Sequence, residues 1–239
     1  MKVAIIPARF GSKRIRNKNL REFQGKPLFL HSVSAAVESE IFDKIIVSSD
    51  SDEILAIAKS QGVAGLSRSP ELSNDTSIIT EVVNSIILSE LIKSTDLVCC
   101  LLPSNPFIES QTLINALNYV DHWDFVFPIV RGSDPIQRAL SRDSNGLTRM
   151  RDNHFTLTRS QDLDAYYFDS GQFYFGYANK WSSNQPILGS RSYGMILDRK
   201  DSVDIDTEFD WELANFLFAK RTFNNNLRTN IDLNKEVGI

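Results

Sequence analysis

Apolar and polar residues alternate along the first 130 residues in blocks that predict strands and helices in turn. Short continuous apolar runs predict buried strands, and longer stretches with apolar residues three or four apart predict helices. The predicted strands are residues 2–7, 44–48, 97–102 and 125–130. The predicted helices are residues 27–37, 53–61, 78–93 and 113–120. This rhythm predicts an α/β fold with a mainly parallel sheet sandwiched by helices, and ligands bound beyond the carboxyl ends of the strands.

The alternation breaks down after residue 130, where Arg, Asp, Ser and Asn dominate for about thirty residues. Dense aromatic sequence at residues 166–176 then predicts a return to strand, and residues 211–218 carry apolar side chains on one side of a final helix. The sequence after Arg221 is polar and rich in asparagine. We therefore predict a core of residues 1–130 and 161–220, an excursion at residues 131–160 and a polar C-terminal tail at residues 221–239.

The composition narrows the class of protein. Of the 239 residues, 42% are hydrophobic and 23% are charged, and the net charge of -4 argues against a nucleic-acid binder. No apolar run approaches the roughly 20 residues that span a bilayer, and the N-terminus enters a strand without a signal-peptide pattern, so we expect no membrane partner and a cytoplasmic location. The two cysteines, Cys99 and Cys100, would point to opposite faces of one strand. This favours reduced core residues over a metal pair or a vicinal disulfide.

A basic loop, residues 6–19, directly follows the first predicted strand and reads IPARFGSKRIRNKN. Between residues 8 and 27 the chain holds seven Lys or Arg side chains against one acid, Glu22, although the whole chain is acidic. Such a local inversion of charge favours an anionic partner. Arg9 and Lys13 can pair with phosphate oxygens and Ser12 can donate its hydroxyl, while Gly11 is expected to let the backbone turn tightly. The loop lacks the spacing of a Walker loop or a dinucleotide-binding turn, and a solvated basic turn is the alternative.

A pair of aspartates forms the second candidate site. Residues 202–207 read SVDIDT, and on a strand Asp204 and Asp206 would share one face while the apolar residues pack behind them. Adjacent carboxylates repel unless a cation neutralises them, and Mg²⁺ prefers hard oxygen ligands together with substrate phosphates. The alternative is an exposed acidic strand face. With the basic loop, this pair predicts Mg²⁺-assisted attack on a nucleoside triphosphate.

Three separated motifs resemble, in the same order, those of the acylneuraminate (nonulosonate) cytidylyltransferases. They are the basic loop, RSPELSNDT at residues 68–76 and SVDIDT at residues 202–207, and the resemblance covers about residues 1–220. Members of that family join CTP to a nine-carbon 2-keto sugar acid and release pyrophosphate. The resemblance implies a Rossmann-like nucleotidyltransferase fold, Mg²⁺ as cofactor, and in-line attack by the anomeric 2-hydroxyl of the sugar on the α-phosphorus of CTP.

Two further segments favour pseudaminic acid as the sugar. TRSQDL at residues 158–163 and DSGQFYFG at residues 169–176 resemble TRSQDL and DAGQFYWG, the usual wording of pseudaminic acid cytidylyltransferases. Sialic acid enzymes typically carry NGxxY in the second segment and Gln where this chain has Leu102, which cannot hydrogen-bond an N-acyl group. The chain departs from the usual wording at Phe10, Ser170 and Phe175. The alternatives are another sugar acid (legionaminate, neuraminate or an octulosonate) and a nucleotide-binding protein without turnover.

The resemblance also implies roles for individual residues. Those implied to contact the nucleotide are Arg9, Gly11, Ser12, Lys13, Lys18, Asn19 and, for the cytidine, Arg68. Asp204 and Asp206 carry over as magnesium ligands, and the residues expected to support catalysis are Arg9, Lys13, Asp204 and Asp206. The general base is not identified by the sequence.

For the sugar, Arg159 is the candidate to bind a carboxylate or phosphate, because a guanidinium forms paired hydrogen bonds to either. Gln161, Gln172 and Tyr174 are candidates for neutral hydrogen bonds, with surface exposure or core packing as the alternative roles. Residues 131–160 resemble the part of these enzymes that mediates homodimerisation and extends toward the partner's sugar site. A homodimer is therefore expected.

Overall fold

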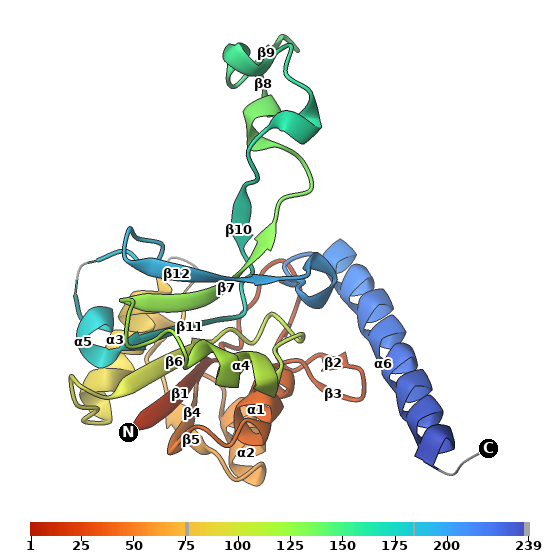
Figure 1. Ribbon diagram of the computed structural model, residues 1–239. Coiled ribbons are helices and arrows are strands. Elements are labelled where there is room, and N and C mark those ends of the chain that lie inside the picture. Colours follow the sequence, from red (N-terminus) through yellow and green to blue (C-terminus); the bar gives the residue numbers. More distant parts are fainter. Residues whose placement is uncertain (75–76, 184, 237–239) are drawn as a thin grey trace.

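A mixed sheet of eight strands forms the centre of the molecule (Figure 1). The computed structural model describes residues 1–74, 77–183 and 185–236, and from residue 224 onward it describes the backbone alone. The strands are β1 (Lys2–Pro7), β4 (Lys44–Ser49), β5 (Ala64–Ser67), β6 (Leu97–Leu101), β7 (Phe125–Arg131), β10 (Tyr167–Asp169), β11 (Phe173–Tyr177) and β12 (Ser192–Leu197). Their order is β7, β11, β6, β1, β4, β5, with β10 and β12 also paired to β7. Only β10 and β11 run against the other strands of this sheet.

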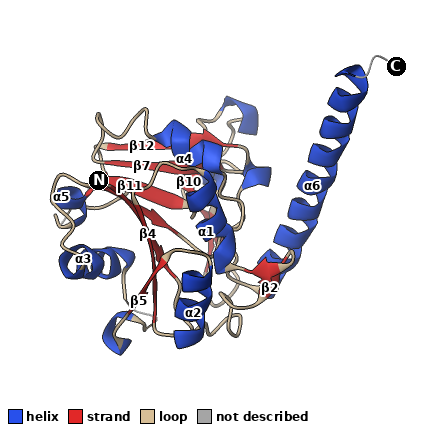
Figure 2. Ribbon diagram, turned by 90° about the horizontal axis from the view of Figure 1, so that it is seen from below, coloured by secondary structure: helices blue, strands red, loops and turns tan. Residues whose placement is uncertain are grey.

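Helices cover both faces of the sheet (Figure 2). On one face lie α1 (Phe29–Glu38), α2 (Asp52–Ser60) and α4 (Ser110–Ala116), and on the other lie α3 (Ile79–Ser89) and α5 (Ala178–Trp181). Each strand of the sheet's centre divides its side chains between the two cores, because successive residues point to opposite faces. Cys99 packs in one core and Cys100 in the other, and both are free thiols. The prediction of a mainly parallel sheet sandwiched by helices is confirmed.

The segment between β7 and β10 extends away from the sheet (Figure 1). It contains the hairpin of β8 (Leu140–Arg142) and β9 (Thr148–Met150), together with 3-10 turns at Ile136–Arg138, Asn153–Phe155 and Ser160–Asp162. We call residues 132–166 the arm. The predicted excursion at residues 131–160 falls in this part of the chain, and the division into core, excursion and tail stays a prediction.

The C-terminal helix α6 (Glu208–Glu236) is longer than predicted, since the sequence indicated a helix only at residues 211–218. Apolar spacing identified the part that packs and could not identify the polar continuation. Trp211 and Ala214 are buried in a third core, where they pack against the hairpin of β2 (Glu22–Phe23) and β3 (Lys26–Pro27). The other buried members of this core are Ile15, Phe23, Leu28, Phe107, Val203 and Ile205. This core therefore ties the basic loop and residues 202–207 to one helix.

Residues 202–207 form a loop, so the predicted strand there is wrong. The expected alternation is nevertheless present, because Val203 and Ile205 are buried. The segment joins no strand ladder, and the Ile205 amide donates to the Ser104 carbonyl at 3.0 Å. No helix of the described ranges is both long and apolar enough to cross a membrane.

Two sheet strands, β5 and β12, escaped the sequence pattern because glycine interrupts their apolar character. A Cβ at Gly65 would lie 3.2 Å from the Leu55 carbonyl oxygen, and one at Gly194 would lie 2.6 Å from Ile129 Cδ1. The Leu55 carbonyl of α2 and the Ile129 side chain of β7 approach these two backbones closely. Glycine therefore eases packing at two positions where it weakens the sequence signal for a strand.

His31 of α1 is buried beside the third core, and its Nε2 lies 2.9 Å from the Phe23 carbonyl oxygen. Burial lowers the pKa of His31 from 6.5 to about 4. The unfolded chain therefore takes up a proton at a higher pH than the folded protein does. The stability associated with neutral His31 is fully present above pH 6.5 and is lost as the pH falls toward 4.

We predict that His31→Gln reduces the loss of stability between about pH 7 and about pH 5, because glutamine keeps a hydrogen-bonding group without titrating. Urea denaturation midpoints at the two pH values measure the effect. The control is His122→Gln, which changes an exposed histidine. Equal pH dependence in the two variants would contradict the prediction.

Candidate functional site

Two adjoining cavities lie at the carboxyl ends of β1, β5 and β6. The loop cavity, of about 330 Å³, is lined by Arg9, Ser12, Lys13, Arg14, Lys18, Asn19 and Asp206. The strand-end cavity, of about 220 Å³, is lined by Pro7, Arg9, Lys18, Asn19, Arg68, Leu72, Asn74, Ser77, Ile79, Val82, Leu102, Pro103 and Ser104. The two share Arg9, Lys18 and Asn19. All nucleotide-binding candidates from the sequence except Gly11 therefore line one continuous region.

The basic loop is held by polar contacts to its backbone. The Phe10 amide donates to Asp50 Oδ1 at 2.8 Å, and Asn19 Nδ2 donates to the Arg9 carbonyl at 2.7 Å. The tight turn is made at Asn17, whose φ of 52° is left-handed and tolerated by asparagine. At Gly11 a Cβ would meet no described atom within 4 Å. The described contacts therefore give no steric reason for glycine at that position.

Lys18 joins the basic loop to the C-terminal aspartates. Its Nζ donates to the Ile205 carbonyl at 2.6 Å and to Asp206 Oδ1 at 3.2 Å. Arg14 Nη2 lies 2.8 Å from the same Asp206 oxygen. Two cations thus converge on one carboxylate, and the ion pairs bring together residues 188 positions apart in the chain. Asp206 lies inside the cationic loop cavity as a consequence.

The start of α6 fixes the direction of the aspartate segment. Asp210 Oδ2 accepts from the Asp206 amide at 3.1 Å and from the Thr207 amide at 2.8 Å, while the Asp210 amide donates to Thr207 Oγ1 at 3.2 Å. This reciprocal arrangement is a capping box, with aspartate in the place that glutamate commonly fills. It begins the helix and holds the Asp206 backbone at the mouth of the loop cavity.

Asp204 lines a different cavity from Asp206. Burial raises the pKa of the Asp204 carboxyl above its ordinary value, and the charges of Asp206 and Asp169 add to the rise. A hydrogen bond with the Ser104 side chain and the positive charge of Lys18 oppose it. Three carboxylates therefore act on one another across this segment, which is the electrostatic setting that a cation would relieve.

The donor chemistry at Asp204 and Asp206 fits Mg²⁺. Among the residues whose placement is described, no group of three or more His, Cys, Asp or Glu side chains is arranged to hold a metal ion. Mg²⁺ does not require such a group, because it is commonly bound by one or two carboxylates together with water and substrate phosphates. The neighbouring cations of the loop cavity are suited to those phosphates.

Arg68 reaches the strand-end cavity from the end of β5. Its side chain is only 8% exposed, and Nε donates to Ser73 Oγ at 3.2 Å. Burial lowers the pKa of the Arg68 guanidinium, with the Asp50 charge opposing that shift. Within the described part of the chain, its buried Nη2 has no hydrogen-bond partner, and neither has Asn19 Oδ1. Both atoms belong to residues that line the cavity, where a bound ligand can pair with them. The last two residues of this motif, Asp75 and Thr76, lie outside the described residues.

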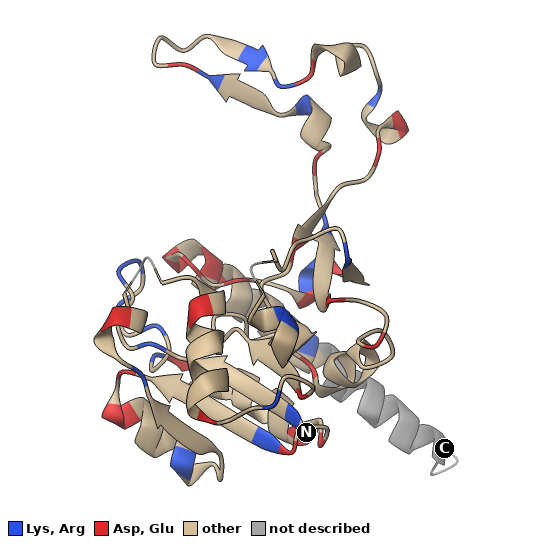
Figure 3. Cartoon of the chain, turned by 90° about the vertical axis from the view of Figure 1, so that its left-hand side faces the viewer, with Lys and Arg blue, Asp and Glu red and all other residues tan. Residues whose placement is uncertain are grey.

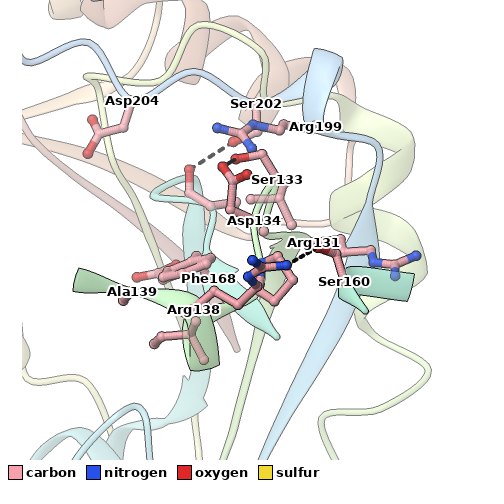
Figure 4. A pocket seen from close by; sticks show the side chains of 16 residues that line it. Arg131, Ser133, Asp134, Arg138, Ala139, Ser160, Phe168, Arg199, Ser202 and Asp204 are labelled. Carbon is pink, nitrogen blue, oxygen red and sulfur yellow. Dashed lines mark hydrogen bonds between the residues drawn. The ribbon is translucent and has the colours of Figure 1, made fainter. Parts of the chain in front are cut away.

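The third and largest cavity, of about 860 Å³, lies where the arm leaves the sheet (Figure 4). We call it the stem cavity. It is lined by Val130, Arg131, Gly132, Ser133, Asp134, Pro135, Ile136, Arg138, Ala139, Ser160, Phe168, Asp169, Ser170, Arg199, Ser202 and Asp204. Asp204 therefore stands between this cavity and the region lined by the nucleotide-binding candidates.

The predicted sugar-binding residues fall into two groups. Gln172 and Tyr174 are buried near the stem cavity without lining it: Gln172 Nε2 donates to the Asp201 carbonyl at 2.8 Å, and the Tyr174 hydroxyl donates to Asp169 Oδ2. Arg159 and Gln161 lie exposed on the arm. Arg159 Nε pairs with Asp162 Oδ2 at 2.9 Å, and neither side chain lines any of the three cavities. The structure thus does not bring these four candidates together in one chain.

Three polar residues near the site were missed by the sequence reasoning. Asp50 positions the basic loop, Ser104 hydrogen-bonds Asp204, and Asp169 receives hydrogen bonds from Tyr174 and from the Gly171 amide at 3.1 Å. Asp50 and Ser104 both follow the end of a parallel strand, where ligands of α/β sheets are bound. That position is the signal that could have identified them.

Comparisons with known proteins agree on one family. A sequence profile described as cytidylyltransferase matches residues 3–197. The pseudaminic acid cytidylyltransferase of Campylobacter jejuni is 38% identical over 223 residues, which cover 90% of this chain and 95% of that protein. The N-acylneuraminate cytidylyltransferase of Escherichia coli is 29% identical over 238 residues, covering 98% of this chain and 55% of that protein. A solved structure of CMP:2-keto-3-deoxy-manno-octonic acid synthetase with CTP has the same fold, with a TM-score of 0.67, 16% identity, and coverage of 92% of this chain and 99% of that one.

We predict that Arg68→Met weakens CTP binding about tenfold or more, because it removes a buried guanidinium whose Nη2 is unpartnered within the described residues. Isothermal titration calorimetry with CTP measures the affinity. The matched control is Arg16→Met, which removes an exposed arginine of the basic loop. Arg16 lines neither the loop cavity nor the strand-end cavity. Equal affinities of the two variants would contradict the role of Arg68.

Proposed function

The chain belongs to the cytidylyltransferase family, and from this premise we propose that it transfers CMP from CTP to pseudaminic acid and releases pyrophosphate. It is an enzyme, a CTP-dependent nucleotidyltransferase. The choice of sugar is supported by the 38% identity to the pseudaminic acid enzyme of Campylobacter jejuni, which this chain matches over 95% of its length. One structural observation carries the proposal: Asp206 lies within a cavity lined by cations that are suited to phosphate, and Asp204 lines the stem cavity.

The three cavities suggest an assignment of the substrates. The strand-end cavity, with buried Arg68, suits the cytidine, and the loop cavity suits the triphosphate. The stem cavity remains for the sugar acid. In this arrangement the anomeric 2-hydroxyl meets the α-phosphorus at the segment that carries Asp204 and Asp206.

The reaction is a direct displacement. The anomeric oxygen forms a bond to the α-phosphorus, the bond from that phosphorus to the oxygen of the β-phosphate breaks, and pyrophosphate leaves toward Arg9, Ser12 and Lys13. The hydroxyl proton passes to an oxygen of the carboxylate pair or to water held there. Positioning and charge neutralisation supply most of the catalysis in such transfers.

We assign Mg²⁺ as the cofactor, with Asp204 and Asp206 as its protein ligands. When bound, Mg²⁺ supplies positive charge against the phosphate oxygens. Arg14 and Lys18 both form ion pairs with Asp206, and we infer their roles from these pairs. They orient that carboxylate, and they lie where triphosphate oxygens can share their hydrogen bonds.

The test of this function is pyrophosphate release from CTP, UTP or ATP with a panel of sugar acids: pseudaminate, legionaminate, N-acetylneuraminate and an octulosonate. We expect turnover with CTP, and a kcat/KM for pseudaminate about tenfold or more above that for the other acids. Comparable use of another acid would contradict the choice of sugar. CTP binding without turnover of any acid would favour a nucleotide-binding protein.

In the same assay, we expect Asp206→Asn to reduce turnover by about a hundredfold or more without weakening CTP binding, because it removes a metal ligand and releases two cations. The control is Asp52→Asn, at an exposed aspartate in the first turn of α2. Retained turnover in Asp206→Asn would overturn the metal assignment.

We further propose that the enzyme is a homodimer joined through the arm. The arm exposes large apolar side chains, among them Leu157 at 96%, Leu140 at 65% and Leu147 at 54%. Arg and Asp residues are interspersed along it, so both signs of charge are present (Figure 3). Exposed apolar groups with mixed charges suit a self-complementary interface. In a dimer, Arg159 and Gln161 could contribute to the partner's sugar site, since they line no cavity of their own chain.

We predict that Leu157→Glu dissociates the dimer, because burying the new charge at the interface is unfavourable. Size-exclusion chromatography with light scattering measures the mass. Leu88→Glu is the control, since Leu88 is 76% exposed on α3 and outside the arm. A wild-type enzyme that is active as a monomer at every concentration would exclude the dimer.

The reaction also suggests where the enzyme acts. CTP is available in the cytoplasm, so we propose a cytoplasmic location. The product is a nucleotide-activated sugar acid, which a glycosyltransferase of glycan biosynthesis would consume.

A further inference from the structure

Ser170 carries a buried hydroxyl beside the stem cavity. The residue lines that cavity and is only 4% exposed. Considering the described residues alone, its Oγ has no hydrogen-bond partner. A buried hydroxyl without a protein partner is unusual in a native structure.

Hydrogen bonds fix the Ser170 backbone at both its amide and its carbonyl. The position of the backbone that carries the hydroxyl is therefore fixed. Its amide donates to the Pro128 carbonyl at 3.1 Å. Its carbonyl accepts from Asn105 Nδ2 at 2.9 Å and from Ser202 Oγ at 2.9 Å. These bonds join the residue to β7, to the loop after β6 and to the segment before Asp204.

The turn that carries Ser170 packs directly against Asp204. The next residue, Gly171, has a left-handed φ of 62°, and a Cβ there would lie 3.1 Å from Asp204 Oδ2. The turn that carries Ser170 is therefore held against Asp204, which lines the same cavity. A group hydrogen-bonded to Ser170 would lie near the reacting end of the sugar acid.

The chemistry of the cavity defines what the hydroxyl can meet. Arg131 and Arg199 bring guanidinium groups to the same lining, which suits an acid. A serine hydroxyl donates one hydrogen bond and accepts others, so its partner is a hydroxyl or an acyl oxygen. Resting on the proposed function, we propose that Ser170 Oγ hydrogen-bonds an oxygen of the bound sugar acid and determines which acids are accepted.

The test compares Ser170→Ala with Ser133→Ala across the sugar-acid panel. Ser133 lines the same cavity, but it is exposed and its hydroxyl already donates to Asp134 Oδ2 at 2.8 Å. We expect Ser170→Ala to raise the KM for the preferred acid about tenfold, with the KM for CTP unchanged. The preference among the acids should also shrink, because an acid that lacks the partner oxygen loses nothing.

Thermal unfolding separates this role from a structural one. Ser170→Ala should unfold at the same temperature as the wild type or higher, since removing an unpartnered buried hydroxyl breaks no protein hydrogen bond. An unchanged KM and acid preference would overturn the inference, and so would a lowered unfolding temperature with the KM for CTP and for the acid raised together. If the wild type uses no acid at all, the proposed function fails, and this inference fails with it.

Discussion

The contact of Lys18 with the Asp206 segment is the interaction on which the site depends. The Lys18 ammonium is largely buried and bonds both a carbonyl and a carboxylate of the segment that precedes α6. Without that cation, the mutual repulsion and desolvation of Asp204 and Asp206 would be offset less, by Arg14 at Asp206 and by the Ser104 hydrogen bond at Asp204. The contact also closes the molecule, because it joins a loop after β1 to a segment near the last helix. Apolar packing of Ile15 against Val203 and Ile205 supports it from beneath.

The reversed strand β11 explains how a second substrate can lie beside the first. In a wholly parallel sheet, the turn before a strand would lie at the edge opposite the ligand site. Because β11 runs against β6 and β7, the turn at Ser170 and Gly171 lies at their carboxyl ends. The arm leaves and re-enters the sheet at the same edge, through β7 and β10. One reversal of direction thus brings Asp169, Ser170 and the arm to the aspartate segment.

Local patterns predicted the parts of this site better than their assembly. The basic loop, Arg68 and the aspartate pair were identifiable because each is a charged motif next to an apolar run. Their convergence follows from strand order, which requires contacts between distant residues. The aspartates were expected on one face of a strand, but they lie in a loop and face different cavities. Likewise, the motif that contains Arg159 resembles one of the family and suggested a sugar-binding role. The sequence pattern could not indicate that the arm places Arg159 away from the three cavities of its own chain.

The unpartnered buried atoms at the cavities show why a complete hydrogen-bond account points to ligands. A buried polar group without a partner destabilises the folded chain, so its persistence needs a compensating reason. Asn19, Arg68 and Ser170 each carry such an atom, judged against the described residues, and each lines a cavity at the carboxyl edge of the sheet. Asn19 and Arg68 belong to motifs shared with the family, whereas Ser170 stands where the usual wording has alanine. The first two are therefore expected to serve the common nucleotide, and the third is proposed to contact the sugar acid. A chain can carry that cost at Ser170 if binding of its own sugar acid removes it.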